Sequence, residues 1–228
     1  YLRAAGQADS SLGHYYRARE LFVGLQDSAR AGIMSLNMAN LLNTQGNYQE
    51  AEDIAVEGLK FIEGTERTRY ISGLYNALAI ATKELKNYED ALSWYDKALG
   101  LSADSLDRLN IANNKAVVLL RQGKPGAARD LLQELSQSPL LDSPGNERAR
   151  ARILDNLGYA EFTSGERGPA EAHLQAALQL RQQIGYRAGE QVSALHLSEF
   201  YSENRPARAY EMALRALELS RELENPED

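Results

Sequence analysis

The chain has 228 residues, 43% hydrophobic and 25% charged, with a formal net charge of −7 at pH 7. This acidic balance argues against a surface for nucleic acid or anionic membranes. The sequence contains no cysteine, which excludes disulfides, thiolate catalysis and thiolate metal sites. No apolar run approaches the roughly 20 residues of a membrane-spanning helix.

Six segments share one pattern: a helical stretch, a short turn that usually holds Gly, and a second helical stretch. In chain order they are residues 1–21, 38–59, 78–99, 116–135, 157–178 and 197–217. The first segment is cut off at its front, so residues 1–2 are expected to be the tail of a preceding helix. The closing residues 223–228 are interpreted as a linker into another helix. The chain is therefore expected to be a fragment of a longer protein.

Small residues recur near the start of each second helix at intervals of about 40 residues. They are Ser11, Ala51, Ala91, Ala128, Ala170 and Ala209. Another small residue usually follows seven positions later, as Gly58 follows Ala51, and positions i, i+4 and i+7 share one helix face. The first helices carry matching small residues at Ala39, Ala79, Ala116, Gly158 and Ser198. The pattern predicts helices that pack closely in an all-α solenoid, an architecture that usually serves binding.

Two copies carry the clearest motifs, Gly46-Asn47-Tyr48-Gln49-Glu50-Ala51 and Asn87-Tyr88-Glu89-Asp90-Ala91. These motifs resemble the tetratricopeptide repeat family, and the match covers nearly the whole chain. The resemblance implies a right-handed superhelical solenoid of antiparallel helix pairs, with about five full repeats and a partial N-terminal one. The expected single domain covers residues 1–228, with approximate repeats at 1–26, 27–65, 66–103, 104–141, 147–184 and 187–224. Lys115 departs from the pattern, because the family has a large apolar residue there.

In such arrays the first helices line a concave groove, so the resemblance also implies binding positions. The expected groove residues are Asn37, Asn40, Asn76, Asn113, Asn114, Asn156, Tyr159 and His196. Asn is a mediocre helix former, so its recurrence on one face asks for a reason. Its amide both donates and accepts, and can therefore hold a peptide backbone as a ladder. The alternative is that these Asn side chains bond neighbouring helices, water or local backbone.

Catalysis has little support in the sequence. The His residues are isolated, and no Gly-rich phosphate loop or nucleophile motif occurs. His196 and Glu199 have the i, i+3 spacing of metal ligands, but a lone pair on one helix is weak evidence. We therefore expect no enzyme activity, no cofactor and no metal site. A basic clamp for chaperone C-termini is not expected either, since its groove places hold Leu36, Ala77, Asn113 and Asp155.

The sequence predicts a binding scaffold whose partner is a protein or peptide, without nucleic acid or membrane contact by this region. Arrays with the linker pattern of residues 184–189 resemble the sensory parts of bacterial signalling proteins, which suggests a regulatory role. In that case the compartment would be periplasmic for a membrane-bound sensor, and otherwise cytoplasmic. The alternative is a self-associating structural adaptor that assembles a larger complex. The oligomeric state stays open.

Overall fold

The computed structural model describes residues 2–224, with side chains described for residues 10–223. The chain divides into two compact units, unit 1 (residues 1–118) and unit 2 (residues 119–228). Every regular element in the described range is helical, which confirms the all-α repeat fold. None of the helices in this range is long and apolar enough to cross a membrane. The single domain predicted over residues 1–228 stays a prediction.

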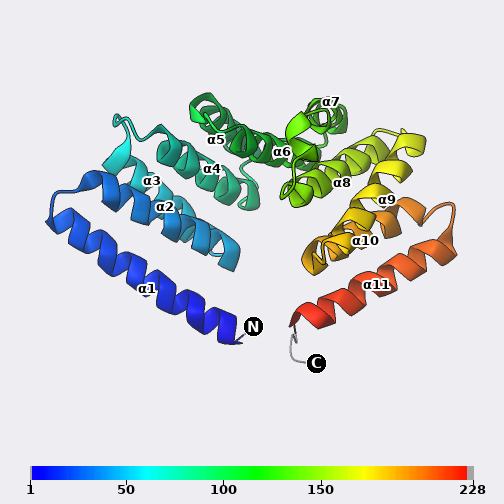
Figure 1. Cartoon of the computed structure of the whole chain (residues 1–228), viewed down its shortest axis with the longest axis horizontal. Coiled ribbons are helices and arrows are strands. Elements are labelled where there is room, and N and C mark those ends of the chain that lie inside the picture. Colours follow the sequence, from blue (N-terminus) through cyan, green and yellow to red (C-terminus); the bar gives the residue numbers. More distant parts are fainter. Residues whose placement is uncertain (1, 225–228) are drawn as a thin grey trace. The chain divides into compact units, whose positions relative to one another are not determined.

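Unit 1 is a stack of helices joined by short turns, in which α1 to α4 lie side by side (Figure 1). Helix α2 packs against α3 and also against α4, so successive first helices are neighbours. Helices α4 and α5 form the next antiparallel pair. The bounds are α1 Leu2–Gly24, α2 Ser28–Gln45, α3 Tyr48–Ile62, α4 Thr68–Glu84, α5 Tyr88–Leu101 and α6 Ser105–Arg121, the last of which crosses the unit boundary.

The turns of unit 1 follow from local backbone chemistry. The Asp27 carboxylate accepts a hydrogen bond from the Arg30 backbone N–H at 3.0 Å and caps the start of α2. Gly46 ends α2 in the left-handed region, with a φ of 81°, where glycine carries no Cβ penalty. The equivalent turn after α4 places Lys86 at a φ of 67°, so this repeat adopts the same conformation without a glycine.

Unit 2 repeats the same construction. Helix α8 packs against α7, α9 and α10, and α10 packs against α11. The short 3₁₀ helix η1 contacts α8, within the long break that separates the helical patterns between residues 136 and 147. The bounds are α7 Pro125–Ser136, η1 Pro139–Asp142, α8 Glu147–Thr163, α9 Arg167–Gln183, α10 Arg187–Tyr201 and α11 Pro206–Glu224.

The recurring small residues lie where the helices approach each other. Those at the predicted positions in the second to fifth copies are buried, namely Ala39, Ala51, Ala79, Ala91, Ala116, Ala128, Gly158 and Ala170. At Gly58 an added Cβ would stand 2.7 Å from the Cβ of Ser35, which is closer than side chains tolerate. The predicted close packing is therefore confirmed in these copies. Ser11 is exposed, and Ala209 is only half-buried.

The N-terminal segment differs from expectation. Helix α1 runs without interruption over Leu2–Gly24, where the sequence pattern predicted the tail of one helix and the start of another. Gly6 alone costs a helix interior only about 1 kcal/mol, and packing of α1 on α2 offsets such a cost. The linker was expected at residues 223–228, but Leu223 and Glu224 belong to helix α11. Residue 1 and residues 225–228 lie outside the described residues.

Candidate binding groove

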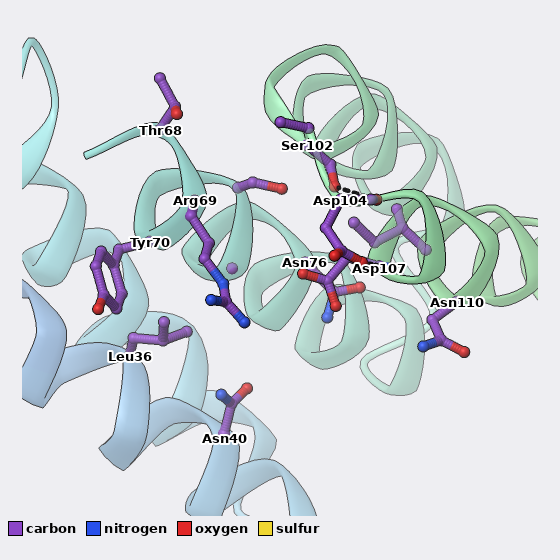
Figure 2. A pocket seen from close by; sticks show the side chains of 14 residues that line it. Leu36, Asn40, Thr68, Arg69, Tyr70, Asn76, Ser102, Asp104, Asp107 and Asn110 are labelled. Carbon is purple, nitrogen blue, oxygen red and sulfur yellow. Dashed lines mark hydrogen bonds between the residues drawn. The ribbon is translucent and has the colours of Figure 1, made fainter. Parts of the chain in front are cut away.

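A groove with a volume of about 850 Å³ lies in unit 1 between α2, α4 and the beginning of α6 (Figure 2). Helix α2 contributes Leu36 and Asn40, which are one helical turn apart and so share a face. Helix α4 contributes its first two turns and Asn76. The loop before α6 and the first turns of α6 close the far side. The groove is thus lined by residues of three first helices and by the loop before α6.

Asn40 and Asn76 bring amide groups from successive first helices into this one groove. Asn40 is exposed and Asn76 is half-buried. The side-chain oxygen of Asn76 is buried and has no hydrogen-bond partner within the described part of the chain. A buried acceptor without a partner costs about 1–3 kcal/mol. The groove therefore brings together two amide side chains, and that of Asn40 is exposed.

Charged side chains stand on two sides of the groove. Arg69 extends into it from the first turn of α4, and Asp104 and Asp107 lie on its α6 side (Figure 2). The Asp104 carboxylate accepts the Asp107 backbone N–H at 2.8 Å, which caps the start of α6. Asn110 also lines the groove and already has an interaction within the structure. The chemistry of the groove is therefore polar and of mixed charge.

The other asparagines of the predicted ladder in unit 1 occupy different surroundings. Asn37 and Asn114 are half-buried and do not line this groove. Asn113 is 1% exposed and already has an interaction partner. For Asn113 the structure therefore favours the alternative, in which the amide bonds within the fold.

In unit 2, the predicted groove residue His196 belongs to a buried ionic network centred on Asp155. Its carboxylate lies 2.7 Å from Ser193 Oγ, 3.3 Å from Arg181 Nη1 and 2.9 Å from His196 Nδ1. Because a carboxylate only accepts, Nδ1 of His196 carries the proton in this contact. Burial alone would raise the pKa of Asp155, but the hydrogen bond and charge of His196, the Arg181 cation and Ser193 hold that pKa below its ordinary value.

Tyr159 contacts the His196 member of this network. Their rings stack with centroids 4.4 Å apart, and the Tyr159 hydroxyl donates to Glu199 at 3.2 Å. Burial, followed by the nearby Glu199 carboxylate, raises the pKa of Tyr159. Asn156 also has a partner already. His196 thus pairs with Asp155 instead of sharing a ligand with Glu199, and the described residues contain no group of three or more potential metal ligands.

Sequence reasoning missed Arg69, Asp107 and Asn110, although helical periodicity could have found them. Arg69 precedes Asn76 by seven residues, and Asp107 precedes Asn110 by three. Both spacings place side chains on one helix face. The predicted groove positions come only from the middle of each first helix, whereas the groove extends to the first turns of α4 and α6.

Two family models described as tetratricopeptide repeat match the chain, one at residues 70–137 and the other at residues 36–64 and 150–184. No curated protein matches the chain. Among solved structures, BtubC from P. vanneervenii is 18% identical, and the match covers 96% of this chain and 92% of BtubC with a TM-score of 0.73.

Two further similar structures involve peptides. PlcR of Bacillus thuringiensis, solved in complex with the peptide PapR7 and DNA, is 18% identical over 86% of this chain and 71% of PlcR, with a TM-score of 0.71. YrrB, described as having an unusual peptide-binding site, is 17% identical over 90% of this chain and 94% of YrrB, with a TM-score of 0.54. At these identities the likeness concerns the fold alone.

Proposed function

Because this chain belongs to the tetratricopeptide repeat family, we propose that it is a scaffold that holds an extended peptide or partner segment in the groove of unit 1. The observation that carries the proposal is the pair Asn40 and Asn76, which line the same groove from the successive first helices α2 and α4. Asn76 lines the groove from α4, and an amide side chain can bond both the donors and the acceptors of a peptide backbone. An extended peptide offers such donors at regular intervals.

The decisive experiment uses a library of random peptides of about eight residues, screened against the whole chain and followed by titration of the best binders. Asn76→Ala should weaken binding by roughly tenfold, because one hydrogen bond contributes about 1 kcal/mol or more. Asn40→Ala should act in the same direction. Asn47→Ala is the matched control, since Asn47 is exposed and its side chain makes no cap bond. Equal effects of Asn76→Ala and Asn47→Ala would contradict the proposal.

Asn113→Ala separates the groove from the rest of the ladder. Asn113 is buried and engaged, so its removal should lower the thermal unfolding temperature and leave the affinity of the remaining folded protein unchanged. A loss of affinity without a loss of stability would instead restore Asn113 to the binding surface.

We propose, more specifically, that the scaffold has a sensory or regulatory role in a bacterial signalling protein. It is supported by the resemblance of the linker at residues 184–189 to sensory arrays, and by similarity of fold to PlcR, whose structure contains a peptide. Determining the flanking gene sequence tests it. A full-length protein that ends at this array would contradict a sensory role and leave peptide binding in place.

Self-association as an adaptor is the second candidate, favoured by an exposed apolar stripe on α11. Tyr210, Leu214 and Leu217 are 70%, 43% and 47% exposed, and their spacing places them on one face. A second copy of the chain would cover this stripe. Light scattering at about 100 µM would then give a dimer mass that Leu214→Lys returns to a monomer. A monomer for the unchanged chain would contradict this candidate.

A further inference from the structure

The groove of unit 1 contains opposite charges that the fold leaves uncompensated. Within the described part of the chain, Arg69, Asp104 and Asp107 form no ion pair, although many other charged residues do. The side-chain contact that Asp104 does make is the cap bond, which it accepts from the Asp107 backbone. A cation on the α4 side thus faces two carboxylates on the α6 side, and all three border the same concave space.

Arg69 and Asp104 are exposed and Asp107 is half-buried, and charges that border one concave site act together on a ligand more strongly than scattered charges on an open surface. A uniformly acidic ligand would meet the two carboxylates, and a uniformly basic one would meet Arg69. The arrangement therefore favours a ligand that carries both signs. In an extended peptide, side chains at positions i and i+2 point to the same side and lie about 7 Å apart. Two such side chains can enter one groove together.

We propose that the groove selects an extended segment with one basic and one acidic side chain two positions apart. The basic side chain lies against Asp104 and Asp107, and the acidic side chain lies against Arg69. Asn40 and Asn76 hold the intervening backbone. This inference rests on the proposed function and adds to it the chemical class of the peptide.

The apolar residues of the groove are consistent with such a segment. Leu36 and Ile111 line it together with the ring of Tyr70. They provide contact area for the stems of Lys or Arg, which bury their methylenes while the charged ends remain at polar groups. The polar contacts then determine which side chains fit, and the apolar residues add area that depends little on sequence.

The test uses synthetic peptides of about eight residues built from Ser, Thr and Val, titrated against the whole chain by fluorescence anisotropy. One series carries Lys and Glu two positions apart in either order, and others carry Lys alone, Glu alone or no charge. The Lys and Glu peptide in its better order should bind at least about tenfold tighter than the neutral peptide. The gain should shrink as salt is raised to about 1 M, where screening reaches about 3 Å.

Substitutions assign each charge to its place. Arg69→Gln should remove the gain contributed by Glu and keep that contributed by Lys. The double variant Asp104→Asn with Asp107→Asn should do the reverse, and an asparagine at the first of these positions remains a good helix cap. Arg67→Gln and Asp53→Asn are matched controls, because both residues are exposed in unit 1 and neither lines the groove.

The outcomes are distinct. Neutral peptides that bind as tightly as the Lys and Glu peptides would overturn this inference and leave the proposed function intact. The expected charge preference with no response to the groove substitutions would overturn the assignment to this groove. Failure of every peptide, charged or neutral, in both this series and the random library would overturn the proposed function and the inference together.

Discussion

The buried carboxylate of Asp155 provides the sharpest test of what stabilises unit 2. We expect Asp155→Asn to lower the free energy of unfolding of this unit by about 3–5 kcal/mol. The reason is the partner that it leaves behind. The Arg181 side chain is 4% exposed, and among the described residues Asp155 is its ion-pair partner, at 3.3 Å. The other contacts of Arg181, with Gly189 O at 2.8 Å and Ser193 Oγ at 2.7 Å, are neutral.

A double substitution distinguishes a buried-charge effect from a packing effect. Replacing Asp155 by Leu and Arg181 by Met removes both charges, and such exchanges are often neutral or stabilising. The double variant should therefore be at least about 2 kcal/mol more stable than the sum of the two single effects predicts. Asp130→Asn is the control, because Asp130 is a carboxylate of unit 2 whose side chain is 70% exposed. It should change stability by less than about 0.5 kcal/mol.

Hydrogen exchange measured by mass spectrometry is the suitable assay, because an array of repeats in two units need not unfold in one step. The exchange free energies of amides in α8 and α10 should fall in Asp155→Asn and stay unchanged in α2 and α4. If Asp155→Asn costs no more than Asp130→Asn, the network is not a stabilising element and the reasoning is wrong.

The same network predicts a direction with pH. The pKa of Asp155 is lower in the folded chain than in the unfolded chain, where a carboxyl of this type titrates near about 3.9. The stability that this group contributes is therefore fully present above about pH 4, and is lost as pH falls through the folded-state pKa. The difference in unfolding free energy between the unchanged chain and Asp155→Asn should therefore shrink as the pH falls below about 4.

Three further predictions concern unit 1. Lys86→Gly should raise stability in urea unfolding by about 0.5–1 kcal/mol, because relief of a left-handed backbone at φ 67° outweighs the entropy cost of glycine. Gly58→Ala should lower stability by about 1 kcal/mol or more in the same assay, since its Cβ would stand 2.7 Å from that of Ser35. Burial and the hydrogen bond to Glu63 raise the pKa of Tyr75 to about 12. The unchanged chain should therefore lose stability relative to Tyr75→Phe between about pH 10 and 12, as measured by circular dichroism during alkaline titration.

Much of the fold could be predicted because its determinants are local and repeated. A small residue at i and another at i+7 mark a face that must pack closely, and the buried Ala51 and Ala91 occupy such positions. The motif around Tyr48 recurs around Tyr88, and each begins a second helix. The N-terminal segment was harder to predict, because one Gly in a polar stretch resembles a turn although α1 continues through it.

The groove could be predicted only in part. The repeat pattern of the sequence placed Asn40 and Asn76 on the first helices, and these two residues do line one groove. It could not reveal that Asn113 is buried, because burial depends on which side chains the neighbouring helices bring against that position. Nor could it pair His196 with Asp155, a contact between residues on two different first helices.

Residues at the same position of the repeat can have different surroundings, and the clearest example is the position three residues before the small residue of each first helix. That place holds Asn76 in α4 and Asp155 in α8. Around Asp155, neighbouring helices supply Arg181, Ser193 and His196, so the carboxylate is satisfied within the fold. Around Asn76, the described residues supply no donor to its buried oxygen. A shared position in the repeat therefore fixes where a side chain lies, but the partners brought by adjacent helices decide whether that side chain is satisfied within the fold.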